Sequence, residues 1–216
     1  MQARNFKYSQ AARTILWVML ALSIPALVQA ESVAPAANQV QPLLVGSAIP
    51  VVTLQSIDGE EKNLRDIVSE KPTILIFYRG GWCPYCNTHL GQLREVEDDL
   101  VGLGYQVLAV SPDSPETLSV AEATPESSYT ILSDSSTAAA QGFGLVFRVD
   151  DKTLERYQQY NIDIEKASGM KHHNLPVPAA FVIGTDGIID FAYVNPDYKV
   201  RVDPSVLLAA AKAALK

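Results

Sequence analysis

The chain has 216 residues with 24 acidic and 17 basic side chains, which gives a formal net charge of −7. Such an acidic balance argues against nucleic acid and anionic membranes as partners. The length suffices for one domain with a full apolar core, which needs no disulfide bridge to support it.

The first 30 residues predict a secretory signal peptide. Three basic residues are followed by an apolar run from Ile15 to Val28, and Val28-Gln29-Ala30 is a suitable cleavage site. A membrane anchor is the alternative, but a span needs about 20 apolar residues, and Ser23 and Pro25 interrupt this shorter run. We therefore expect secretion across the inner membrane into the periplasm, with no membrane association after cleavage.

Residues 31–44 are rich in Ala, Pro, Gln and Val without periodicity, which predicts a flexible lead-in before a domain at 45–216. Within that domain strands and helices then alternate. Strand-like runs lie at 49–54, 73–78, 106–110 and 129–132, and helical patterns lie at 64–69, 84–103, 115–123 and 135–141. This alternation predicts parallel strands with helices on both faces of the sheet.

A polar segment at 150–174 follows, with one expected helix at 152–160. Two further strand-like runs at 175–183 and 188–194 are joined by Asp186-Gly187, a pair typical of tight hairpin turns. An Ala- and Leu-rich helix at 204–215 ends the chain. The pattern as a whole predicts an α/β domain in which the hairpin adds antiparallel strands to the sheet.

The chain has two cysteines, Cys83 and Cys86, three positions apart after the apolar strand at 73–78. Pro84 suits the first turn of a helix, so the pair lies at a strand-to-helix junction, where the helix dipole favours thiolate over thiol. A disulfide across so short a loop adds little stability, and we interpret the pair as a redox-active dithiol. Cys86 lies on the apolar face of the helix, whereas we expect Cys83 to be the exposed sulfur.

The stretch at 77–86, the run at 177–183 and Asp186-Gly187 resemble the thioredoxin-like fold. Within that fold they resemble the AhpC/TSA superfamily, particularly peroxiredoxin-like proteins with a C-x-x-C motif. The resemblance covers roughly residues 45–215. It implies an α/β fold with a central mixed β-sheet flanked by helices.

The same resemblance implies that Cys83 and Cys86 are the catalytic pair, which cycles between a dithiol and a redox-active disulfide without metal or other cofactor. The residues expected to shape the site are Trp82, Pro84, Tyr85, Arg79 and Pro178. Pro178 corresponds to the family's cis-proline, which packs beside the dithiol and exposes backbone to an incoming thiol substrate.

This sequence departs from the peroxidase motif of the family, Pro-x-x-x-Thr-x-x-Cys. Alignment places Arg79 at the proline, Cys83 at the threonine and Cys86 at the peroxide-attacking cysteine. Pro178 also falls about where the family's peroxide-orienting arginine would stand. Arg79 is the first candidate to supply that positive charge, and Arg148 is a weaker candidate based on fold analogy.

Two reactions are compatible with this dithiol. A thiol peroxidase would reduce hydrogen peroxide or organic hydroperoxides through a sulfenic acid, and the family motif then favours Cys86 as the attacking cysteine. A thiol-disulfide oxidoreductase would use Cys83 as nucleophile and Cys86 as resolving cysteine. Both end in the same disulfide, which needs a thiol electron donor such as a thioredoxin-like protein or a small thiol. We favour the peroxidase.

Two other classes of function remain as alternatives. His172-His173 together with Cys83 and Cys86 could form a soft metal site, as in thioredoxin-fold copper chaperones, although adjacent histidines on a polar loop are more often only solvated. A non-catalytic binding module is the third class. His89, one helical turn after Cys86, is expected to be a surface residue, with a proton relay as the alternative.

Overall fold

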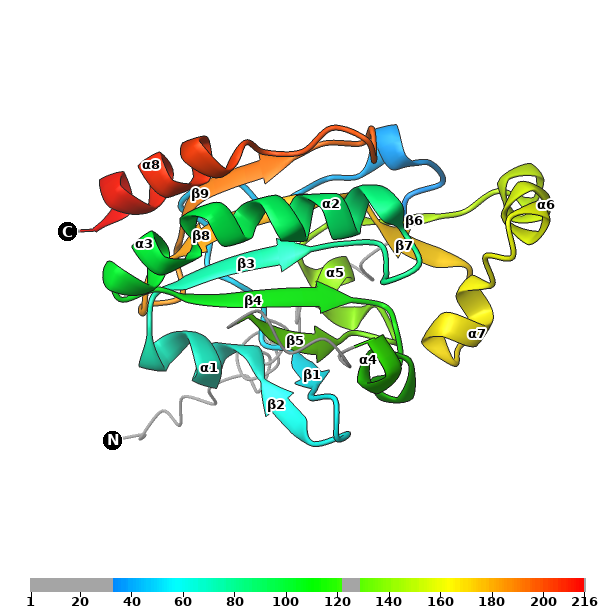
Figure 1. The fold of residues 1–216 in the computed structure, drawn as a ribbon, viewed down its shortest axis with the longest axis horizontal. Coiled ribbons are helices and arrows are strands. Elements are labelled where there is room, and N and C mark those ends of the chain that lie inside the picture. Colours follow the sequence, from blue (N-terminus) through cyan, green and yellow to red (C-terminus); the bar gives the residue numbers. More distant parts are fainter. Residues whose placement is uncertain (1–32, 122–128, 216) are drawn as a thin grey trace, which may run out of the picture. The chain divides into compact units, whose positions relative to one another are not determined.

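The computed structural model describes residues 33–121 and 129–215, so the predicted signal peptide lies outside the described residues. A seven-stranded sheet has the order β2-β1-β5-β4-β3-β8-β9, and β6 and β7 form a separate pair (Figure 1). The strands are β1 (Thr53–Gln55), β2 (Glu61–Asn63), β3 (Thr73–Phe77), β4 (Gln106–Ser111), β5 (Thr130–Ser133), β6 (Val146–Arg148), β7 (Asn174–Pro176), β8 (Ala179–Ile183) and β9 (Ile189–Val194). The helices are α1 (Leu64–Glu70), α2 (Pro84–Leu93), α3 (Glu97–Gly102), α4 (Pro115–Ala121), α5 (Ala138–Gly142), α6 (Asp151–Gln159), α7 (Ile164–Ser168) and α8 (Pro204–Ala214).

Strand β3, which leads to the dithiol, has a neighbouring strand on each side. It pairs in parallel with β4 and antiparallel with β8, while β4 pairs in parallel with β5. All five residues of β3 are buried, as expected for an apolar strand covered on both faces. The antiparallel pair of β8 and β9 completes the sheet and confirms the predicted mixed arrangement.

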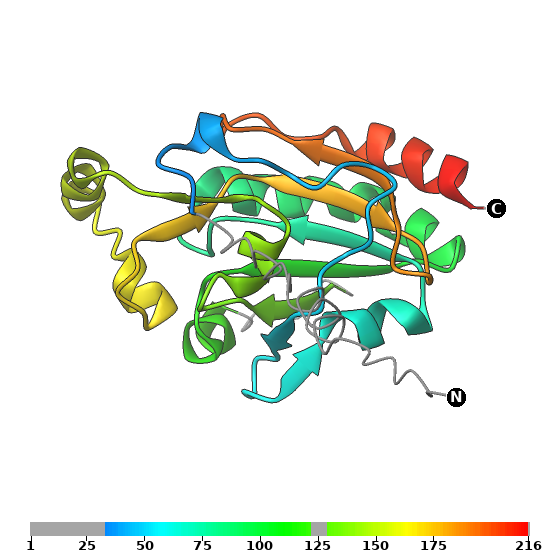
Figure 2. The ribbon, with the colours of Figure 1, turned by 180° about the vertical axis from the view of Figure 1, so that it is seen from behind.

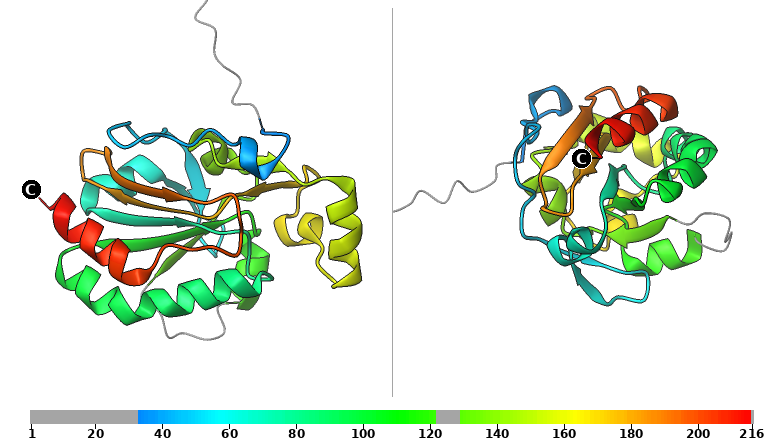
Figure 3. Two further views of the ribbon diagram at one scale, coloured as in Figure 1. Left: turned by 90° about the horizontal axis from the view of Figure 1, so that it is seen from above. Right: turned by 90° about the vertical axis from the view of Figure 1, so that its left-hand side faces the viewer.

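Helices cover both faces of this sheet (Figure 3). Residues of α2, α3 and α8 pack against Ile74 and Ile76 of β3. Residues of α1 and α5 pack on the opposite face, against Leu75 and Phe77. This division follows from the strand itself, because successive side chains of a strand point to opposite faces.

The segment at 33–44 is packed against the domain, contrary to the expectation of a flexible lead-in, and it crosses the sheet in Figure 2. The Gln41 N–H donates to the Gly144 carbonyl over 3.1 Å, and the Leu43 N–H donates to the Phe143 carbonyl over 3.1 Å. Apolar side chains of the segment also contact the core below α5. The segment is a strap with a single 3-10 turn at Ala37–Gln39, and it lacks periodicity because the side chains that it buries are scattered along it.

The polar segment at 150–174 contains the predicted helix, α6, together with a second helix, α7. Asp150 begins α6 by accepting a hydrogen bond from the Thr153 N–H over 2.9 Å, which satisfies an end group of the helix. Figure 1 shows α6 and α7 beyond the carboxyl ends of β3 and β4. In the described parts of the chain, no helix has the length and apolar character that crossing a membrane requires.

Candidate active site

The dithiol lies at the start of α2, as the sequence predicts. Cys83 is the N-cap residue of α2, and Pro84 occupies the first turn, where its missing N–H costs no helical hydrogen bond. The N–H groups of Cys86 and Asn87 both donate to the Cys83 carbonyl, over 3.0 and 3.1 Å. No disulfide bond joins the two cysteines.

Both sulfur-bearing residues are buried, and the expectation that Cys83 is exposed is wrong. Cys83 and Cys86 are each 1 % exposed. Tyr78 and Ala109 enclose the pair in one apolar cluster, and the partly buried Trp82 packs against it. A position at the helix start does not by itself expose a side chain, because the loop before the helix folds over it.

The buried carboxyl group of Asp113 holds the loop that leads into Cys83. The Gly81 N–H donates to Asp113 Oδ2 over 2.7 Å, and the Ser111 hydroxyl donates to the same oxygen over 3.2 Å. Burial raises the pKa of Asp113, with these hydrogen bonds opposing the shift. The Asn87 side chain donates to the Gly81 carbonyl over 2.9 Å and fixes the loop from the helix side.

Arg79 is buried among aromatic rings, with only 4 % of its surface exposed. The guanidinium carbon lies 5.0 Å from the ring centre of Trp82, 5.7 Å from that of Tyr157 and 4.3 Å from that of Tyr198. Nη2 of Arg79 also donates to the Tyr157 hydroxyl. Tyr157 comes from α6 and Tyr198 from the loop between β9 and α8, so no local motif near Arg79 marks either contact.

A second arginine, Arg201, reaches the dithiol from the loop before α8. Its Nη2 lies 3.3 Å from the Cys86 sulfur. Arg201 was not a predicted site residue, because 115 positions separate it from Cys86 and no local motif marks it. Arg148, the weaker candidate from fold analogy, instead donates to the His172 carbonyl over 3.0 Å.

The two thiols have opposite ionisation behaviour. A hydrogen bond from Cys86 is the largest effect that lowers the pKa of Cys83, to about 6, and the charges of Arg79 and Arg201 lower it further against the opposing effect of burial. The pKa of Cys86 is raised, because it donates to Cys83 and because it is buried. The resting pair therefore keeps one proton, on Cys86, and Cys83 carries the negative charge.

The other predicted site-shaping residues lie at the same end of the sheet. Tyr85 is partly exposed and meets Tyr198 edge to face, with ring centres 5.6 Å apart. Pro178 is buried just before β8, whose first residue, Ala179, pairs with Phe77 at the end of β3. The expectation that the peptide bond before Pro178 is cis is wrong, because no peptide bond among the described residues is cis.

His89 is buried, which contradicts the expected surface position. Burial lowers its pKa to about 4, and the nearby charge of Arg201 lowers it as well. The imidazole is therefore neutral at neutral pH, and its buried Nε2 has no hydrogen-bond partner. Helical spacing places His89 beside the apolar face of α2, close to Arg201 and Val202 of the loop before α8.

The two adjacent histidines have partners other than the cysteines. His172 Nε2 lies 2.7 Å from the Ser135 carbonyl oxygen, and His173 Nε2 lies 2.6 Å from a carboxylate oxygen of Glu165. Across residues 33–121 and 129–215, no group of three or more His, Cys, Asp or Glu side chains could hold a metal ion. The geometry thus gives no support to a copper site built from His172, His173 and the dithiol.

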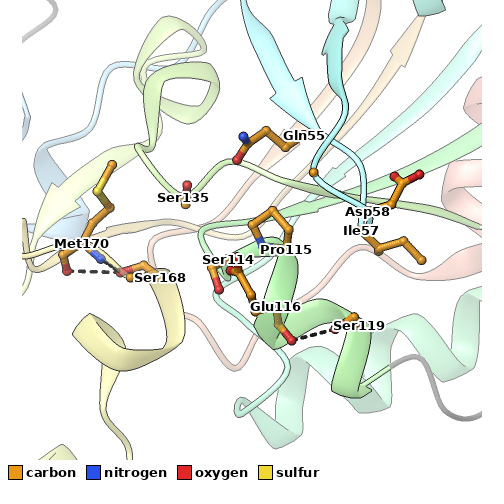
Figure 4. Close-up of a pocket in the computed structure, with 12 residues that line it drawn as sticks. Gln55, Ile57, Asp58, Ser114, Pro115, Glu116, Ser119, Ser135, Ser168 and Met170 are labelled. Atoms are coloured by element: carbon orange, nitrogen blue, oxygen red, sulfur yellow. Dashed lines mark hydrogen bonds between the residues drawn. The ribbon is translucent and has the colours of Figure 1, made fainter.

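A polar pocket of about 470 Å³ lies elsewhere, between the β1–β2 turn, the start of α4 and the end of α7 (Figure 4). Its lining includes Gln55, Asp58, Ser114, Glu116 and Met170, but neither cysteine. The hydroxyl groups of Ser114, Ser119 and Ser168 each donate to a nearby residue of the chain, Ser119 to the Glu116 carbonyl for example. The chemistry of the dithiol is therefore separate from this pocket.

Known proteins share this fold and part of this sequence. Peroxiredoxin Bcp of Escherichia coli is 33% identical over 104 residues, which are 48% of this chain and 66% of that protein, slightly less than two thirds of its length. Peroxidoxin BcpB from Mycobacterium tuberculosis has a TM-score of 0.60 at 18% identity, with 80% of this chain and 98% of that chain covered. Reduced Prx3 from Vibrio vulnificus in complex with H2O2 has a TM-score of 0.64 at 16% identity, with 79% and 96% covered.

These structural similarities confirm the predicted thioredoxin-like fold, with its mixed central sheet flanked by helices. The sequence model of the AhpC/TSA family matches residues 45–192, which is more than half of the chain and includes the dithiol. The chain belongs to the AhpC/TSA family.

Proposed function

We propose that the protein is a thiol peroxidase, which reduces hydrogen peroxide or organic hydroperoxides with the Cys83/Cys86 dithiol. The observation that carries this proposal is a buried pair of free thiols that shares one proton beside the guanidinium groups of Arg79 and Arg201. Membership of the AhpC/TSA family and the likeness to peroxiredoxin Bcp support the same reaction.

The proposed reaction begins at Cys83, which carries the thiolate. Its sulfur attacks one peroxide oxygen, the O–O bond breaks, and the leaving oxygen takes both electrons of that bond and a proton to become water or an alcohol. Cys83 is then a sulfenic acid. The Arg79 charge favours the thiolate before attack, and it can also stabilise negative charge that develops on the leaving oxygen.

The second step joins the two sulfurs. Cys86 loses its proton and attacks the sulfur of the Cys83 sulfenic acid, so that an S–S bond forms and water leaves. The guanidinium of Arg201, 3.3 Å from the Cys86 sulfur, can stabilise the Cys86 thiolate at this stage. A thiol electron donor, which we propose to be a thioredoxin-like protein or a small thiol, then returns two electrons to the disulfide.

Single variants Cys83→Ser and Cys86→Ser test this assignment under anaerobic mixing with hydrogen peroxide, with trapping of sulfenic acid and mass spectrometry. We expect Cys86→Ser to form a trapped sulfenic acid on Cys83. Cys83→Ser should react about 30-fold more slowly than Cys86→Ser, because an ordinary thiol is only about 3 % ionised at pH 7.

Three results would contradict parts of this proposal. No peroxide-dependent oxidation in either variant would exclude the peroxidase. Faster oxidation of Cys83→Ser would assign the attack to Cys86, as the family motif suggests. A stopped-flow rate for a mixed disulfide several orders of magnitude above the rate for peroxide would instead favour thiol-disulfide exchange.

We also propose that the protein is exported and acts in the periplasm. The support is the basic, apolar and small-residue pattern of residues 1–30. Expression of all 216 residues, followed by cell fractionation and mass spectrometry, should give a periplasmic chain that begins at Glu31. A chain starting at residue 31 is the control and should stay in the cytosol, whereas an uncleaved cytosolic full-length chain would contradict export.

A further inference from the structure

We propose that Trp82, Tyr157 and Tyr198 form an aromatic clamp that positions the guanidinium of Arg79 for the dithiol, with Tyr157 and Tyr198 as positioning residues. The three rings come from three separate segments: the loop before α2, helix α6, and the loop before α8. The proposal deepens the proposed peroxidase function and rests on it for the peroxide step, but not for the ionisation of the thiols.

The geometry of the clamp is that of a cation held over aromatic faces. All three ring centres lie within 5.7 Å of the guanidinium carbon of Arg79, inside the range of about 6 Å at which cation–π attraction operates. Trp82 and Tyr157 also contact one another, with ring centres 5.6 Å apart. The planar, weakly hydrated guanidinium of arginine tolerates such an enclosure better than the ammonium group of lysine.

The clamp holds Arg79 without neutralising it. Among the residues that the structure describes, no carboxylate forms an ion pair with Arg79, and its buried Nε–H has no hydrogen-bond acceptor. A carboxylate partner would fix the guanidinium equally well but would cancel its charge. Aromatic rings fix it and leave the full positive charge free to act on a neighbouring anion.

The hydroxyl of Tyr157 also remains neutral in this position. Burial raises the pKa of Tyr157, with the charge of Arg79 opposing the shift, so the phenol accepts the Arg79 hydrogen bond without becoming a phenolate at neutral pH. The anion that remains for Arg79 is the Cys83 thiolate, whose pKa the Arg79 charge lowers. The proposed role of the clamp is therefore to keep Cys83 ionised.

Other charged groups also act on Cys83, so the most direct test of the clamp leaves them unchanged. The titratable and charged groups that face Cys83 are Cys86 on α2, Arg79 in the loop after β3, Arg201 before α8 and Tyr157 on α6. Substitution of Tyr198 removes none of these groups. Tyr198→Leu is therefore the variant that changes the clamp alone. Tyr198→Phe keeps the aromatic ring and should restore the native behaviour.

The experiment is a pH titration of thiolate absorbance in the reduced full chain. We expect Tyr198→Leu and Tyr157→Phe to move the midpoint of the first ionisation upward by about 0.5 pH unit, since each removes one contact that holds the cation near Cys83. Tyr198→Phe should titrate like the unmodified protein. Tyr160→Phe is the matched control, because Tyr160 follows α6 and is 70 % exposed.

Arg79→Met gives the upper limit of the effect and should raise the midpoint more than either tyrosine variant. The clamp is overturned if Tyr198→Leu and Tyr157→Phe keep the native midpoint while their circular dichroism spectra stay native. It is also overturned if Tyr198→Phe shifts as far as Tyr198→Leu. The titration needs no peroxide, so absence of peroxidase activity with the expected midpoints would contradict the proposed function and leave the clamp standing.

Discussion

Gly80 determines the path of the chain into the dithiol. Its φ of +140° is a conformation that residues with a side chain rarely adopt. A Cβ atom at this position would lie 2.4 Å from Trp82 Nε1 and 2.8 Å from Asp113 Oδ1. The absence of a side chain at Gly80 therefore lets the Trp82 ring and the Asp113 carboxylate both approach the loop.

We expect Gly80→Ala to destabilise the fold by about 2 to 4 kcal/mol, because it adds backbone strain and a steric clash at one position. Gly91→Ala is the matched control: Gly91 lies inside α2, and an added Cβ would meet no atom within 4 Å beyond its chain neighbours and the backbone of the helix itself. That change should stabilise the protein by about 0.5 to 1 kcal/mol, through better helix propensity. Urea denaturation measures both, and native stability of Gly80→Ala would contradict this account.

At the scale of elements, the sequence predicted the strand, turn and helix around the dithiol but missed an interruption in the helix that follows. The apolar repeat from Cys86 to Leu103 predicts one helix, whereas the structure has α2, a 3-10 turn at Arg94–Val96, and α3. A 3-10 turn keeps neighbours at a spacing of three residues, so the apolar face continues across it and periodicity does not report the break.

Site residues close to the cysteines in sequence were predictable, and those from distant elements were not. Arg79, Trp82 and Tyr85 stand next to the C-x-x-C motif and could be named from it. Arg201 and Tyr198 come from the loop after β9, and only the antiparallel pairing of β9 with β8, and of β8 with β3, brings that loop to the start of α2. The Asp186-Gly187 turn marks the pairing of β8 with β9, but the pairing of β8 with β3 leaves no local pattern.

On the scale of the whole molecule, the strap at 33–44 is part of the domain. Its hydrogen bonds end on the chain after α5, where Gly144 adopts a φ of +69° and a Cβ would lie 1.9 Å from the Gln41 carbonyl oxygen. This close approach shows how tightly the strap follows the surface. Apolar side chains of the strap also pack against the core cluster to which α5 contributes.

Two neighbouring leucines of the strap provide a test of its contribution. Leu43 packs against the core, whereas Leu44 is 76 % exposed. We expect Leu43→Ala to lower the free energy of unfolding by about 1 to 2 kcal/mol, and Leu44→Ala to change it by less than about 0.5 kcal/mol. Thermal and urea unfolding should give the same difference in the free energy of unfolding. Equal effects of the two substitutions would show that packing of Leu43 adds no stability.

Because both sulfurs are buried, the rate at which a reactant gains access to the dithiol can limit the reaction. Since 1 % of each cysteine is exposed, we expect a reactant to reach the Cys83 sulfur only when the surrounding loops move apart. Motions of this kind typically take microseconds to milliseconds. For the proposed peroxidase reaction, we expect the rate of oxidation to follow the peroxide concentration when that is low and to level off at the rate of opening when it is high.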